Sequence, residues 1–184
     1  MTQSALKQSD LPHYTLGDYE QWEGNWELIR GIPYAMAPAP SWLHQELNGN
    51  IYSALKVAIG TCDHCKPNLP VNLKIAEDTI VQPDVVVVCK PFKEGLYLEK
   101  MPDLVVEILS PSTSDKDLNL KYELYRDAGI KYYIIVHPID KTATVFCLDP
   151  NSGNQYLNMG IYTSESYRFD LSGCSFDFDF SSIW

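Results

Sequence analysis

The sequence has no long apolar run, no internal repeat and no low-complexity tract. No run among its 184 residues approaches the roughly 20 apolar positions that a membrane-spanning helix needs. The first residues, MTQSALKQSDLPHY, lack the apolar segment of a secretory signal. We therefore expect no membrane association and a cytoplasmic location.

Positive charge is scarce as well. The 14 basic and 24 acidic residues give a formal net charge of −10. Because phosphate binding needs positive potential, this balance argues against a DNA-coating protein, although it leaves room for a small basic groove. Hydrophobic residues make up 45% of the chain and aromatic residues 12%, which is enough for a real core and excludes a disordered chain.

Cysteine is sparse and odd in number. The five cysteines are scattered, which favours a reduced protein over a disulfide framework. The segment CDHC, from Cys62 to Cys65, has the spacing of metal ligands, but it has no second pair, and a zinc site normally needs four ligands. We predict a loop with free thiols here. No G-x-S-x-G motif, P-loop or dinucleotide fingerprint is present.

Hydrophobic periodicity and turn residues predict one α/β domain over residues 1–184, with a mixed central sheet flanked by helices and extra β-hairpins at both ends of the chain. We expect residues 1–13 to be flexible and 14–40 to form a short helix and a hairpin that turns at Arg30-Gly31. Residues 41–138 would form the core, and 139–184 a β-meander.

Within the core, the sequence predicts two helices and several strands. The first helix would start after Ser41 and stop at Gly60, and the second would run from about Asp115, capped by Ser114, to Asp127. The stretches LPVNLKIAED and TIVQPDVVVVC read as two strands that meet at residues 77–78, CDHCKPN as a loop, and KPFKEGLYLEK as a polar insert. The helix ending at Asp127 can form a parallel crossover between the strands before and after it.

One carboxylate stands inside an apolar run. The stretch Leu104–Leu109 reads as a strand buried on both faces, and it contains Glu107. A glutamate is almost never fully buried unless it is paired or binds a metal. Asp84 stands before a run of four valines, and alone it would be a strand-entry residue satisfied by backbone N–H groups. Two carboxylates on neighbouring apolar strands, however, are what a hard cation such as Mg²⁺ needs.

A lysine in the following helix completes the pattern. Lys121 falls near the middle of an apolar arc that includes Leu118, Leu124 and Tyr125. An isolated lysine at such a position would extend its head to water. Because this helix directly follows the Glu107 strand and packs on the sheet, we expect the Lys121 head to meet the carboxylates.

Asp84, Glu107 and Lys121 together resemble the site of the PD-(D/E)XK, restriction-endonuclease-like nucleases. The sequence is most similar to the bacterial Uma-type family, through WELIRG, VQPDVVVV, PDLVVEILSPST, DLNLKYELYRDAGIKYYIIVHP and the β-rich tail, over most of residues 26–180. In the superfamily pattern the lysine follows the second acidic residue by two positions, whereas that position here is Leu109. As in the Uma-type variant, the lysine has moved to the helix.

The resemblance implies a restriction-endonuclease-like fold and Mg²⁺- or Mn²⁺-dependent hydrolysis of a phosphodiester, with DNA as the expected substrate. Asp84, Glu107 and the main-chain carbonyl of Ile108 would hold the metal, and Lys121 would orient the attacking water. Glu27 matches the acidic residue of the family's N-terminal segment and would be an outer metal or water ligand, the alternative being an exposed strand glutamate.

His44 is a further candidate catalytic residue. It shares a helix face with Leu47, Ile51 and Leu55, where a lone histidine is more often a satisfied core group.

Two other functions stay open at this point. The first is a non-catalytic module of the nuclease fold that binds nucleic acid or protein, which the charge of −10 and the displaced lysine favour. The second is a metal-dependent hydrolase of small phosphorylated substrates. If the protein cuts both DNA strands, we expect a homodimer, for which exposed sheet edges would provide a surface.

Overall fold

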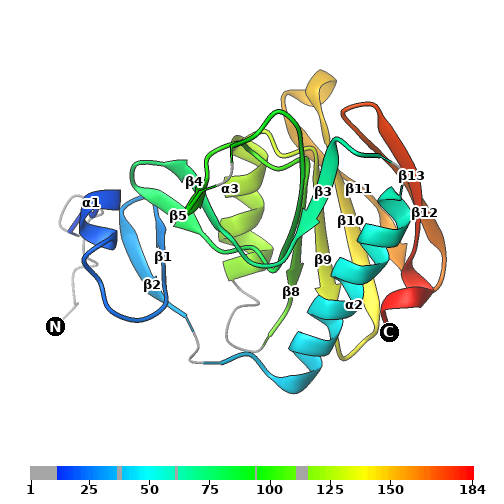
Figure 1. The fold of residues 1–184 in the computed structure, drawn as a ribbon, viewed down its shortest axis with the longest axis horizontal. Coiled ribbons are helices and arrows are strands. Elements are labelled where there is room, and N and C mark those ends of the chain that lie inside the picture. The colour runs from blue at the N-terminus through cyan, green and yellow to red at the C-terminus, as the bar shows by residue number, and fades with distance from the viewer. Residues whose placement is uncertain (1–11, 37–38, 61, 94, 111–115) are drawn as a thin grey trace, which may run out of the picture.

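The computed structural model describes residues 12–36, 39–60, 62–93, 95–110 and 116–184 (Figure 1). Almost all of the segment predicted to be flexible, 1–13, and the predicted helix start at Ser114 and Asp115 lie outside these residues. None of the described helices is long and apolar enough to cross a membrane.

A mixed sheet of six strands forms the centre of the molecule, in the order β11-β10-β9-β8-β6-β3. Its strands are β3 (Cys65–Asn68), β6 (Val85–Cys89), β8 (Leu104–Ile108), β9 (Tyr132–His137), β10 (Thr142–Asp149) and β11 (Gln155–Tyr162). Strands β8 and β9 are parallel, and the other neighbours are antiparallel. The parallel pair is joined through a π-helical turn (Lys116–Lys121) and α3 (Tyr122–Asp127), the predicted crossover.

Smaller elements cover both faces of this sheet. The second sheet has the order β2-β1-β5-β4-β7, and its strands are β1 (Trp26–Ile29), β2 (Ile32–Ala35), β4 (Asn72–Ala76), β5 (Thr79–Val81) and β7 (Tyr97–Leu98). The remaining elements are α1 (Leu16–Tyr19), α2 (Trp42–Ile59), the hairpin β12 (Ser166–Leu171) and β13 (Cys174–Asp179), and 3₁₀ turns at Pro150–Ser152 and Phe180–Ile183.

Strand alternation divides the core into two layers. Val85, Val87 and Val106 pack with α2 and the β12–β13 hairpin on one face of the central sheet. Val86 and Val105 pack with the second sheet and α3 on the other. The valine run of β6 is therefore apolar at every position because both of its faces are covered.

Several predicted boundaries are confirmed. Arg30 and Gly31 both have positive φ, which a tight hairpin turn between β1 and β2 requires. The Ser41 hydroxyl oxygen accepts a hydrogen bond from the backbone N–H of His44 at 3.2 Å and so caps α2. Gly60, with φ of +54°, ends that helix.

Other boundaries differ from the prediction. Part of the predicted loop CDHCKPN is β3, an edge strand held by its pairing with β6. The stretch TIVQPDVVVVC is two strands in different sheets, because Pro83 lies between them and cannot donate to a sheet ladder. The polar insert contains β7, and the described part of the second helix starts with a π-helical turn.

The prediction of free thiols at the CDHC segment was wrong. The structure pairs Cys62 with Cys174 and Cys65 with Cys89, and leaves Cys147 as a free cysteine. The partners are 112 and 24 residues apart, so local spacing could not reveal them.

Candidate active site

Two buried carboxylates from different sheets meet at one lysine. Glu107 lies in the central strand β8, and Glu27 lies in β1 of the second sheet. The Lys121 Nζ is 2.8 Å from Glu107 Oε1 and 2.9 Å from Glu27 Oε1. The exposed fractions of Glu27, Glu107 and Lys121 are 0%, 3% and 3%. The lysine therefore does not reach water, and Glu27 is not an exposed strand residue.

The π-helical turn and α3 supply a second group to this cluster. Tyr125 follows Lys121 by one helical turn, is fully buried, and donates a hydrogen bond from its hydroxyl to Glu107 Oε1 at 2.7 Å. Burial, followed by the negative charge of Glu107, raises the pKa of Tyr125 well above its usual value of 10.0. Tyr125 is thus a neutral donor at physiological pH. The sequence pattern places Tyr125 only in the apolar arc, although its spacing of four residues from Lys121 indicates that the two side chains share a helix face.

Glu27 is held by the backbone as well. Its Oε1 accepts a hydrogen bond from the N–H of Gln82 at 2.9 Å, just beyond the end of β5. Gln82 is a contact that sequence reasoning missed, because the two residues are 55 positions apart.

Asp84 lies beside Glu107 at the end of the sheet. Strands β6 and β8 pair Val85 with Val106, so extending the register by one residue sets Asp84 opposite Glu107. The Asp84 Oδ2 accepts a hydrogen bond from the Ile108 N–H at 2.7 Å. The structure thus shows a contact for the Ile108 amide, while the metal-binding role of its carbonyl stays a prediction.

His44 reaches the same carboxylate from the other face. Its Nε2 is 3.3 Å from Asp84 Oδ2, and the side chains of His44 and Asp84 are 13% and 17% exposed. His44 belongs to α2, which covers one face of the central sheet, whereas Lys121 and Tyr125 come from the other face. The site therefore combines groups from both faces at one end of the sheet. His44 is partnered, as a core histidine would be, but its partner is a candidate metal ligand.

The charge and chemistry of these groups suit a hard cation. Among the described residues, three carboxylates, from Glu27, Asp84 and Glu107, lie around the ammonium of Lys121. An excess of buried or half-buried carboxylates is relieved by a cation near them. Carboxylate oxygens are the donors that Mg²⁺ prefers, so the donor set fits this ion.

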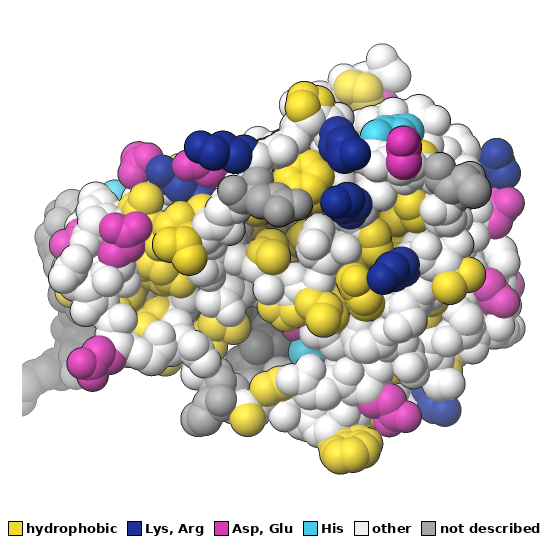
Figure 2. All heavy atoms as spheres, in the orientation of Figure 1, with side chains coloured by type: hydrophobic (Ala, Val, Ile, Leu, Met, Phe, Trp, Pro, Cys, Tyr) yellow, Lys and Arg dark blue, Asp and Glu magenta, His cyan; other side chains and the backbone are white. Residues whose placement is uncertain are grey.

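The basic side chains visible on one face of the molecule lie away from the helix end that carries His44. In Figure 2 the Lys and Arg side chains lie mostly in the upper half of the view. In the same orientation, the N-terminal end of α2, which carries His44, lies in the lower part (Figure 1). The basic side chains of this face do not gather beside that end of the helix.

The contact of Tyr125 with Glu107 leads to a testable prediction. We expect Tyr125→Phe to lower the free energy of unfolding by about 2 kcal/mol, because a buried charged acceptor loses a donor. Tyr156→Phe is the matched control, since its hydroxyl donates at 2.8 Å to the neutral carbonyl of Ile130. That change should cost only about 1 kcal/mol. Urea denaturation measures both, and an equal or smaller loss for Tyr125→Phe would contradict a charged Glu107.

Comparisons with known proteins identify the family and agree with the fold. The model of the Uma2 family, described as "Putative restriction endonuclease", matches residues 16–169. A crystal structure described as "a putative nuclease belonging to DUF820 from Anabaena variabilis ATCC 29413" is similar with a TM-score of 0.71 and 16% sequence identity, over 92% of this chain and 97% of that chain. No curated protein matches the sequence. The solved structure shows that the fold is shared. Because the family model matches most of the chain, this protein belongs to the Uma2 family.

Proposed function

We propose that this protein is an Mg²⁺-dependent endonuclease that hydrolyses phosphodiester bonds in DNA. The observation that supports this most is the convergence of Glu27 and Glu107 on Lys121, with the half-buried Asp84 beside them. Burying a charge network costs desolvation free energy and often adds nothing to stability. Its presence here is therefore consistent with a functional role. The family description and that of the similar structure, both of which name nucleases, support the same function.

Each residue has a distinct part in this proposal. Asp84, Glu107 and the Ile108 carbonyl would hold Mg²⁺ (or Mn²⁺), which when bound lowers the pKa of a water molecule and neutralises phosphate charge. Lys121, fixed between two carboxylates, would orient the attacking water by donating a hydrogen bond. Tyr125 and Glu27 would hold the Lys121 head and the Glu107 carboxylate in place.

His44 can add a positioning function. Its Nε2 is 3.3 Å from Asp84 Oδ2, within reach for an N–H donor to a carboxylate. We propose that His44 positions the Asp84 carboxylate by donating this hydrogen bond. The Ser41 cap fixes the first turn of α2 and thereby the approach of the histidine.

A homodimer and a cytoplasmic location complete the proposal. Strand β11 is an edge of the central sheet and carries three exposed apolar side chains, Leu157, Met159 and Ile161, with exposed fractions of 47%, 41% and 64%. A bulge between positions 158 and 160 places Leu157 and Ile161 on opposite faces of the sheet, so it is the open edge itself that would pair with a second copy. Two copies would bring two sites to one duplex, as cleavage of both strands needs.

A plasmid-nicking assay tests the function. Wild type with millimolar Mg²⁺ or Mn²⁺ should nick supercoiled plasmid, and EDTA should stop it. Asp84→Asn should lower the rate by about 100-fold or more, since even groups that only orient metal ligands are worth roughly 10–100-fold. Asp140→Asn, an exposed change in the turn between β9 and β10, should match wild type.

Other results would redirect the proposal. Plasmid binding without cleavage in either metal would favour the non-catalytic module, which the net charge of −10 also favours. Hydrolysis of a small phosphodiester but not of plasmid would favour the small-substrate hydrolase.

Light scattering on the same preparation measures the oligomeric state, and a monomer at assay concentration would contradict the dimer.

A further inference from the structure

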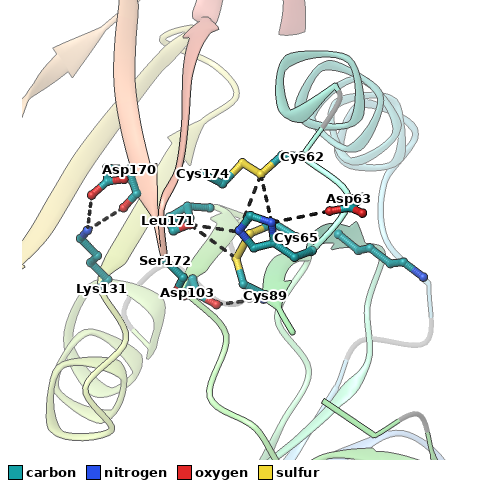
Figure 3. The surroundings of a disulfide bond; sticks show 12 residues. Cys62, Asp63, Cys65, Cys89, Asp103, Lys131, Asp170, Leu171, Ser172 and Cys174 are labelled. Carbon is teal, nitrogen blue, oxygen red and sulfur yellow. Dashed lines mark hydrogen bonds and ion pairs between the residues drawn. A yellow bond between two sulfur atoms is a disulfide. The ribbon is translucent and has the colours of Figure 1, made fainter. Parts of the chain in front are cut away.

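Four cysteines from distant parts of the chain gather in one place (Figure 3). Cys62 and Cys65 lie where α2 leads into β3, Cys89 ends β6, and Cys174 begins β13. The ligand atoms of Cys62, His64 and Cys65 lie within 4.8 Å of one another. Because Cys174 and Cys89 are bonded to Cys62 and Cys65, all four sulfur atoms belong to the same cluster.

The cluster contains the second pair of cysteines that the CDHC segment lacks for a zinc site. One Cys-x-x-Cys pair offers two thiolates, whereas structural zinc takes four ligands in a tetrahedron, commonly four cysteines. The fold brings the second pair from β6 and β13. The sulfur atoms of Cys65 and Cys89 both lie close to the carbonyl oxygen of Leu171, at 3.7 and 3.9 Å, so the hairpin turn packs directly on the cluster.

We propose that the reduced protein binds one Zn²⁺ through the thiolates of Cys62, Cys65, Cys89 and Cys174. Each disulfide would take two electrons and two protons from a dithiol reductant, which itself becomes a disulfide. The four thiols then lose their protons as Zn²⁺ binds, and the tetrathiolate site carries a charge of about −2. The same four sulfur atoms thus form either two disulfides or one metal site.

Groups around the cluster suit this charge. The His64 ring nitrogens lie 3.6 and 3.8 Å from Cys62 Sγ, within reach for an N–H donor to a thiolate. The Asp63 carboxylate lies 3.8 Å from His64 Nδ1, and its side chain is 97% exposed, so solvent screens its negative charge. The Lys100 ammonium donates a hydrogen bond to the Cys89 carbonyl oxygen and adds positive charge nearby.

A surface hollow gives a metal ion access to the cysteine cluster. Cys62 and Cys174 line a surface hollow of about 620 Å³ together with Gly60, Gly173 and Asp177. Cys65 and Cys89 are buried behind them, with exposed fractions of 3% and 0%. An entry path on one side and buried ligands on the other are what a stable site requires.

The zinc site would be structural rather than catalytic. Cys89 and Asp84 lie at opposite ends of β6, which at a strand's rise of roughly 3.3 Å per residue separates them by roughly 16 Å. The metal would tie the end of α2, strands β3 and β6, and the β12–β13 hairpin into one unit. It would therefore raise the stability of the fold without taking part in phosphodiester hydrolysis.

Metal titration of the full-length chain tests the proposal. Wild type is reduced with a dithiol under nitrogen, freed of reductant and titrated with Zn²⁺ against a coloured chelator, and in parallel with Co²⁺. We expect one equivalent to bind, a Co²⁺ spectrum with thiolate charge-transfer bands, and a higher melting temperature with Zn²⁺. Wild type oxidised to the two disulfides should bind none.

Three variants locate the ligands. Cys62→Ser, at a half-buried position that tolerates a polar replacement, and Cys89→Ser should each bind Zn²⁺ about 100-fold more weakly or worse. Cys147→Ser, which changes the free cysteine in β10, is the matched control and should keep one equivalent. Less than stoichiometric binding by reduced wild type, equal binding by the oxidised form, or undiminished binding by Cys62→Ser would overturn the proposal.

Discussion

Lys121→Met should lower the free energy of unfolding of the metal-free protein by about 3–5 kcal/mol. The methionine keeps most of the packing stem but removes the ammonium that contacts both Glu27 and Glu107, two side chains almost inaccessible to water. Two buried carboxylates would then face each other without a counter-charge, which costs far more than the loss of a surface ion pair. Urea denaturation in EDTA measures the change.

Two further variants show whether charge is the cause. Lys131→Met removes a lysine from a surface pair with Asp170 and should cost less than about 1 kcal/mol. Adding Glu27→Gln to Lys121→Met removes the surplus carboxylate and should restore much of the lost stability. If Lys121→Met lowered the free energy of unfolding no more than Lys131→Met does, this would contradict an ionised network of Glu27, Glu107 and Lys121.

The same variant separates stability from catalysis. Lys121→Met should abolish hydrolysis while Mg²⁺ binding survives, because the proposed ligands are Asp84 and Glu107. Nicking is measured at a temperature where the variant remains folded by circular dichroism. Activity equal to wild type would remove the lysine from the mechanism and leave a metal site made by carboxylates alone.

Glu107→Gln should eliminate both hydrolysis and the stabilisation by Mg²⁺. A ligand that binds only the folded state stabilises it by about 1.4 kcal/mol at ten times its Kd, so wild type should melt at a higher temperature in millimolar Mg²⁺ than in EDTA. Glutamine is neutral and a poorer ligand for a hard cation, and the rise in melting temperature should therefore vanish.

Glu27→Gln is the matched control for this change. Glu27 and Glu107 both contact Lys121 through Oε1 and both are buried, but only Glu107 lies opposite Asp84. Glu27→Gln should therefore keep the response of the melting temperature to Mg²⁺. An equal rise in wild type and both variants would mean that the cation binds elsewhere, and no rise in wild type would remove the metal from the proposal.

Much of the local structure follows from the sequence alone, because short-range rules decide it. The hairpin turn at Arg30 and Gly31 and the limits of α2 at Ser41 and Gly60 depend on backbone sterics and on hydrogen bonds within a few residues. The sequence also predicts that Glu107 has a partner, because leaving a carboxylate unpaired inside a buried β-branched run is costly.

Only the tertiary structure decided which groups meet. Glu27 reads as either an exposed or a functional residue until β1 is packed against the π-helical turn, because its contact with Lys121 joins a strand and a helical turn 94 positions apart. The pairing of Cys62 with Cys174 spans 112 positions. Pattern and propensity act over a few residues, whereas such contacts depend on how whole sheets pack. The sequence by itself therefore determined the candidate residue types, the main elements and the family resemblance, and packing determined their partners.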